Sequence, residues 1–217
     1  MNQDVKTSLR IMLGFVAAWL TGSIIFSLLG LFNQPNKPPT FFGLFLAGPI
    51  LGFLAAYIFS KKVRDALFAL PLWAITVTHS LRLVGIAFVI SALTHELAPQ
   101  FGWIAGIGDI VSAIVSIPLA MSLYQKRYSQ GLRLRFILWN IFGILGLFLS
   151  VTLGLLYSPS MVGILSSPVS NTRALSFLPY SLIPTFYVPI LILLHLLALR
   201  RSAEIPERSP RVVPSLR

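Results

Sequence analysis

The most informative segment of this chain is L-W-A-I-T-V-T-H-S-L-R-L-V-G-I-A-F-V-I-S-A-L, residues 72–93. It is apolar along almost its whole length, and its ionisable side chains are His79 and Arg82 alone. A helix needs roughly 20 predominantly apolar residues to cross a hydrocarbon core about 30 Å thick. The segment therefore predicts a transmembrane helix that carries a charged residue inside the bilayer.

Five other segments share this length and apolar character, and together they indicate a multi-pass protein. The six predicted spans are residues 9–32, 41–60, 72–93, 103–124, 136–157 and 178–199. Long apolar segments satisfy their backbone groups in lipid as helices, whereas barrel strands show short alternating patterns. We predict an all-α, polytopic membrane protein in which residues 1–199 form a single six-helix transmembrane bundle. Residues 200–217 are predicted to form a basic, disordered cytoplasmic tail.

The overall composition agrees with this class of protein. Of the 217 residues, 56% are hydrophobic and 11% are charged, and the mean hydropathy is +0.83. A soluble domain carries about a quarter charged residues, so a soluble globule is excluded. The chain has no cysteine, which excludes disulfides, a thiolate nucleophile, an iron–sulfur cluster and a covalently attached c-type haem.

The positive charges follow the predicted spans in a regular way. The chain holds 17 lysines and arginines against 6 acidic residues. If the six spans alternate in direction, fourteen basic residues fall on one side of the membrane and two, Lys37 and Arg173, on the other. Cytoplasmic loops carry the excess of basic residues. We therefore predict a multi-pass protein of the cell membrane with both termini in the cytoplasm. The expected partner is the lipid bilayer and not nucleic acid, while further membrane subunits or a second copy stay open.

Two local patterns modify the picture of straight helices. Residues 61–70 precede Pro71 and place apolar and charged side chains at helical spacing, which predicts a short amphipathic helix at the membrane interface. Pro179, Pro184 and Pro189 fall in the sixth span and predict a kinked or locally unwound helix. The carbonyls freed there are candidates to coordinate a solute or a cation, and a kinked structural helix is the equal alternative.

Small residues recur four positions apart in several spans, which lets helices approach closely in lipid. Two of these rows are Gly14, Ala18 and Gly22 in the first span, and Gly108, Ser112, Ser116 and Ala120 in the fourth. Tight helix packing is the favoured interpretation, and a solute cavity lined by small side chains is the alternative.

Two opposite charges lie inside the predicted spans, and each needs a partner because an ionisable group at membrane depth is costly. At 1.5 Å per residue, Arg82 lies about 15 Å from the cytoplasmic end of its span, and Asp109 lies about 9 Å from the outer end of the next. The remaining gap of about 6 Å is within the reach of an arginine side chain, so we predict that the two residues pair. A structural lock between the spans is the favoured role, with a charge relay or an anion-binding arginine as the alternative.

Further polar residues gather in the predicted cytoplasmic half. Thr76, His79 and Arg82 share one face of the third span at helical spacing. Asn140 in the fifth span and His195 in the sixth lie at depths similar to that of His79. Two histidines on different spans at matched depth are what a b-type haem needs, so His79 and His195 are candidate haem ligands. The alternative for His195 is a structural histidine that is hydrogen-bonded near the interface.

Signatures of catalysis fail when they are checked. His95 and Glu96 match the start of H-E-x-x-H, but Pro99 stands where the second histidine is required. The sequence holds no G-x-S-x-G motif and no phosphate loop, so we lean against an enzyme, and no metal site is predicted.

Three functions remain as hypotheses. The first is a small-solute binding or transport subunit with a buried polar site formed by Arg82, Asp109, Asn140 and Thr76. The second is a membrane electron-transfer protein that binds b-type haem through His79 and His195. The third is a non-catalytic assembly or scaffold subunit, which explains every pattern by packing alone.

Overall fold

The computed structural model describes residues 3–206 and shows a chain that is helical throughout its ordered elements. Within these residues the only strand-like pairing is an isolated bridge between Ser167 and Ser170. In this described part of the chain, six helical segments are long and apolar enough to cross a membrane: Gln3–Leu28, Thr40–Phe59, Leu72–Leu93, Pro99–Tyr124, Leu132–Leu156 and Ile183–Glu204. The predicted all-α class and the six spans are confirmed, and the chain is a multi-pass membrane protein. Residues 207–217 of the predicted tail lie outside the described residues.

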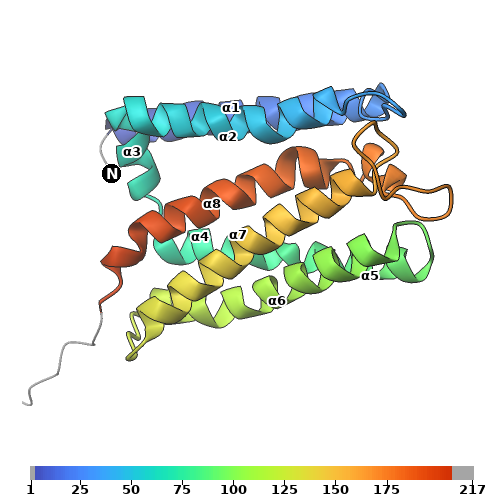
Figure 1. Ribbon diagram of the computed structural model, residues 1–217. Coiled ribbons are helices and arrows are strands. Elements are labelled where there is room, and N and C mark those ends of the chain that lie inside the picture. Colours follow the sequence, from blue (N-terminus) through green and yellow to red (C-terminus); the bar gives the residue numbers. More distant parts are fainter. Residues whose placement is uncertain (1–2, 207–217) are drawn as a thin grey trace, which may run out of the picture.

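The six spans divide into a hairpin and a bundle, as Figure 1 shows. The hairpin consists of α1 (Gln3–Leu28) and α2 (Thr40–Phe59), which contact each other through phenylalanine rings such as Phe26 and Phe45. The bundle consists of α4 (Leu72–Thr78), α5 (Gly85–Leu93), α6 (Pro99–Tyr124), α7 (Leu132–Leu156) and α8 (Val188–Arg201). The short helix α3 (Lys61–Phe68) connects the hairpin to the bundle and confirms the helix predicted before Pro71.

The two ends of the described chain lie at the same end of the molecule. Figure 1 places the start of α1, helix α3 and the end of α8 together, with the loops that follow α1, α5 and α7 at the opposite end. An even number of spans requires this arrangement. Which side of the membrane this end faces stays a prediction from the basic residues.

The ends of several spans differ from the prediction for identifiable reasons. Helix α1 stops at Leu28, before the predicted end at 32, because Gly30 takes a left-handed φ of 69° and turns the chain. Helix α8 continues beyond the predicted end at 199, through Arg201 and into a short 3₁₀ helix, η4 (Ser202–Glu204). The Arg201 guanidinium pairs with Glu204 at 2.8 Å and donates to the carbonyl of Leu70. Residues 200–204 are therefore helical and not part of a disordered tail.

The third span is not a continuous α-helix. A 3₁₀ helix, η1 (His79–Val84), separates α4 from α5. Residues three positions apart eclipse one another in a 3₁₀ helix. His79 and Arg82 consequently project from the same face, as their spacing predicted.

Glycines bring α5 and α6 into close contact. A Cβ on Gly85 would lie 2.7 Å from the carbonyl oxygen of Gly106, and a Cβ on Gly102 would lie 2.6 Å from the Cβ of Ala92. The predicted close packing of the fourth span is confirmed: Ser112, Ser116 and Ala120 of the predicted row are buried, and the closest approaches lie at Gly102 and Gly106, outside that row. Gly108 and Gly14 have no neighbour within 4 Å of a Cβ position, so these two members of the predicted rows make no close approach.

Helix α1 docks on the proline-rich start of the sixth span, which forms a π-helix, η3 (Ile183–Tyr187). Pro189 has no N–H, so the Thr185 carbonyl four residues earlier lacks its usual helical partner. The indole N–H of Trp19 donates to this carbonyl over 2.9 Å, and the Ser23 hydroxyl donates over 3.5 Å. The predicted unwinding of the sixth span is confirmed. The carbonyl of Thr185, expected as a candidate for a solute or cation, is bound by α1 instead.

Candidate functional site

Arg82 and Asp109 form the predicted ion pair in the interior of the bundle. Arg82 Nε donates to Asp109 Oδ1 over 2.9 Å, and Nη2 lies 2.7 Å from the same oxygen. The two side chains are 1% and 8% exposed, respectively. The depth argument from helical rise is therefore confirmed for this contact.

The opposite edge of the guanidinium meets α6, α7 and α8 at a single atom. Arg82 Nη1 donates to Ser112 Oγ over 2.9 Å and to the Gly143 carbonyl over 3.4 Å, and it lies 3.2 Å from His195 Nε2. Arg82 can only donate, so Nε2 of His195 must accept. Nδ1 of His195 then carries the proton and donates to Asn140 Oδ1 over 2.9 Å.

Asn140 completes this chain of hydrogen bonds, because its Nδ2 donates to the Phe136 carbonyl over 2.8 Å. We call the five connected side chains the polar network: Arg82, Asp109, Ser112, Asn140 and His195. Its donors and acceptors alternate in one consistent direction, which fixes His195 as a neutral imidazole. Of the four residues predicted for a polar site, the structure brings Arg82, Asp109 and Asn140 together.

Thr76 lies apart from the polar network. Its hydroxyl donates to the carbonyl of Leu72 over 2.8 Å within the same helix. This bond satisfies the hydroxyl locally, so Thr76 serves the helix backbone in this arrangement.

His79 and His195 stack on each other rather than facing each other end-on. Their ring centroids are 3.8 Å apart with an interplanar angle of 32°, and Trp139 packs against both rings at 5.1 and 5.0 Å. Axial ligation of a haem requires an iron and its macrocycle between the two imidazoles. The stacked rings leave no such space, and both nitrogens of His195 are already bonded, so this arrangement does not fit haem ligation.

Trp139 and Gly143, which support the polar network, and Ser112, which belongs to it, were not predicted as site residues. Trp139 donates its indole N–H to the Ser112 carbonyl over 3.0 Å. A Cβ on Gly143 would collide with the His195 ring and lie 3.1 Å from Arg82 Nη1, so the absence of a side chain there is required. Spacing gives a signal for two of the three, because Ser112 follows Asp109 by three residues and Gly143 follows Asn140 by three.

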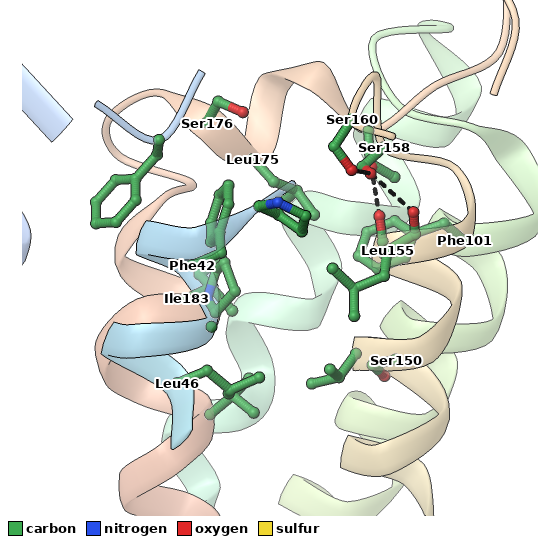
Figure 2. Close-up of a pocket in the computed structure, with 18 of the residues that line it drawn as sticks. Phe42, Leu46, Phe101, Ser150, Leu155, Ser158, Ser160, Leu175, Ser176 and Ile183 are labelled. Atoms are coloured by element: carbon green, nitrogen blue, oxygen red, sulfur yellow. Dashed lines mark hydrogen bonds between the residues drawn. The ribbon is translucent and has the colours of Figure 1, made fainter. Parts of the chain in front are cut away.

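A cavity of about 160 Å³ lies beside the polar network, between α2 and the bundle. Figure 2 shows Phe42 and Leu46 of α2 and Ile183 of η3 on one side, with Phe101, Ser150 and Leu155 across from them. Most of the lining is apolar, and the hydroxyls of Ser158 and Ser160 lie near the loops, 2.6 Å from each other. Sequence reasoning gave a solute cavity only as an alternative and did not locate this one, because its walls come from segments distant in the chain.

Asp109 is the ionisable residue of this cavity among the described residues that line it. It lies ten residues after Pro99, about 15 Å along the helix from the end where the loops lie. Two backbone hydrogen bonds join the loops at that end, from Asn36 N to the Pro159 carbonyl and from Met161 N to the Lys37 carbonyl, at 3.0 and 3.1 Å. The cavity thus extends from these joined loops to the carboxylate of Asp109.

These features define a class: a six-helix membrane protein with a buried ion pair that borders an apolar cavity. Residues 39–202 match the family described as a domain of unknown function, DUF8737, and the chain belongs to this family. The matched residues include the whole polar network, while α1 lies outside them. No curated protein and no solved structure matches the chain.

Proposed function

We propose that this protein is a solute-binding or transport subunit that holds a small, largely apolar solute within the membrane. The observation that carries the proposal is the cavity of about 160 Å³. An apolar cavity of about 150 Å³ is large enough to hold benzene. Protein interiors contain few voids larger than a water molecule, so a cavity of this size is the default candidate for a binding site.

The polar network has a supporting role in this proposal. Asp109 lines the cavity, while Arg82, Asn140 and His195 do not. Arg82 holds the carboxylate of Asp109, and the bonds from Arg82 through His195 to Asn140 hold the guanidinium in turn. Binding of an anionic group by Arg82 is not part of the proposal, because Arg82 does not line the cavity and already forms an ion pair with Asp109.

A cavity-filling variant tests the proposal. A Cβ on Gly154 would lie 3.5 Å from Phe101 and 3.8 Å from Leu175, both of which line the cavity, so Gly154→Leu fills it. Gly108→Leu is the matched control, since nothing lies within 4 Å of a Cβ there and Gly108 does not line the cavity. We expect benzene and toluene to raise the melting temperature of the purified chain. At a ligand concentration one hundred times Kd, the free energy of unfolding should rise by about 2.7 kcal/mol.

The variants separate binding in the cavity from general partition into lipid. The stabilisation should disappear in Gly154→Leu and persist in Gly108→Leu. Equal responses in both variants, or no response in the unmodified chain, would contradict the proposal and favour the scaffold alternative. A haem absorption band in the purified protein would favour the electron-transfer alternative.

A further inference from the structure

We infer that the ligand of this cavity is an uncharged molecule of about one ring in size, which donates one O–H or N–H hydrogen bond to Oδ2 of Asp109. The inference rests on the proposed function and names its ligand class. It follows from three observations: the free oxygen of Asp109, the charge balance around it and the rings that line the cavity.

The first observation is that Arg82 contacts Oδ1 of the Asp109 carboxylate and not Oδ2. Both Nε and Nη2 of Arg82 approach Oδ1, at 2.9 and 2.7 Å. Oδ2 forms no hydrogen bond with any residue in the described range 3–206, although the side chain is only 8% exposed and lines the cavity. Oδ2 is not among the fully buried side-chain atoms without a partner in the described residues, so it keeps some accessible surface. A ligand that reaches it can form a charge-assisted hydrogen bond, which is among the stronger kinds.

The second observation is that the charges near the cavity already cancel. The guanidinium of Arg82 balances the carboxylate of Asp109, and His195 is neutral because it accepts a hydrogen bond from Arg82. A cationic or anionic ligand would add an uncompensated charge within the membrane, which is costly. A neutral donor satisfies Oδ2 and adds no charge.

The third observation is the shape and chemistry of the walls. Phenylalanines contribute on several sides of the cavity, among them Phe42, Phe88 and Phe101, and Phe88 and Phe101 already meet edge to face with centroids 5.2 Å apart. Aromatic rings favour such edge-to-face contacts with one another. A ring with one hydroxyl matches both the volume and the lining.

Phenol and toluene test the inference, because they have the same shape and differ in the hydrogen-bond donor. We would measure their dissociation constants with the full chain in lipid nanodiscs, after subtraction of uptake by nanodiscs without protein. Phenol should bind at least about tenfold more tightly than toluene, as a hydrogen bond to a charged acceptor provides. Benzoate and benzylammonium, the charged probes of similar size, should bind more weakly than phenol.

Variants assign the preference to Asp109. Asp109→Asn keeps one oxygen for Arg82 and places an amide N–H₂ where Oδ2 stood, so the tenfold preference for phenol should be lost. Because this change leaves Arg82 without a counter-charge, the double change Arg82→Leu with Asp109→Leu provides a second test with no lone charge. Ser176→Ala is the control, since it removes a cavity hydroxyl and should keep the preference.

The outcomes separate this inference from the proposed function. If toluene binds as tightly as phenol, and Gly154→Leu abolishes both, the inference is overturned and the proposed function stands. A phenol preference that survives in Asp109→Asn and in the double variant also overturns the inference, as does a charged probe that binds more tightly than phenol. If no probe binds in a manner sensitive to Gly154→Leu, both are overturned.

Discussion

Arg82 connects the third span to three others through one planar group. It contacts Asp109 and Ser112 on α6, the Gly143 carbonyl on α7 and His195 on α8. A buried charge is tolerated when it is paired and hydrogen-bonded. If one member of a buried pair is removed, the other keeps its desolvation cost, whereas removal of both leaves no charge to compensate.

This asymmetry predicts the outcome of a double-mutant cycle. Arg82→Leu and Asp109→Leu should each lower the free energy of unfolding by about 3 to 5 kcal/mol. The double variant should lose less than the sum of the two, because neither side chain then remains as a lone charge. Melting temperatures of the four purified proteins in one detergent would measure the coupling, and strictly additive losses would contradict the contact.

The residue scale also shows what a sequence alone predicts of the site. Helical rise predicted that Arg82 meets Asp109, and matched depth predicted that His79 lies near His195. The sequence did not predict that the two imidazoles stack, or that Arg82 contacts Asp109 on one edge of its guanidinium and Ser112 and His195 on the other. These details depend on the crossing angles of the helices and on backbone carbonyls such as that of Gly143, which spacing along one chain does not encode.

At the scale of elements, α7 contacts the polar network through the backbone of Gly143, which has no side chain. A Cβ on Gly143 would overlap the His195 ring, whereas a Cβ on Gly146 would make an ordinary contact of 3.6 Å with Arg82 Nη2. Gly143→Ala should therefore destabilise the protein by about 1 to 3 kcal/mol through overpacking. Gly146→Ala should leave stability unchanged or raise it, because alanine favours the helix.

The comparison of these two alanine variants can be made by thermal unfolding in a single detergent. Both changes add one methyl group to the same helix, so general effects on insertion or detergent binding should be equal. If the Gly143→Ala and Gly146→Ala proteins have the same melting temperature, α7 does not pack against the polar network in this way.

The contact between α1 and the sixth span gives a second prediction at this scale. The Trp19 ring packs against Phe186 with centroids 5.1 Å apart. Trp19→Phe retains an aromatic ring at this position but removes the N–H that donates to the Thr185 carbonyl. The carbonyl then keeps only the long bond from Ser23, so we expect a loss of about 1 to 3 kcal/mol.

Trp103→Phe is the matched control for Trp19→Phe, because Trp103 is 40% exposed on the outer surface of α6. It should leave the melting temperature unchanged. Equal effects of the two tryptophan variants would contradict a specific role for the indole N–H of Trp19.

The positions of the helices were predictable from composition, whereas the contacts between helices were less so. The six spans follow from length and hydropathy, and Pro184 and Pro189 predicted the break in the sixth span. The rows of small residues were poorer guides, since Gly14 and Gly108 meet no neighbour while Gly85 and Gly106 do. Any glycine permits close approach, and only the relative placement of two helices determines which glycine is used.

At the scale of the whole molecule, the basic residues predict how the protein lies in the membrane. The end that holds α3 and the start of α1 should face the cytoplasm, and the loops around Asn36 and Ser160 the opposite side. Reporter fusions at the C-terminus and within the loop at Asn36 would measure this orientation. A C-terminal reporter on the external side would contradict it.

The direction of the hydrogen bonds at Arg82 has a consequence for proton movement across the membrane. A guanidinium donates on every side and has no lone pair with which to accept a proton. A proton that reached Asp109 from the cavity would therefore stop there, because Arg82 separates it from His195 and Asn140. The polar network therefore provides no continuous path for a proton from Asp109 through His195 to Asn140.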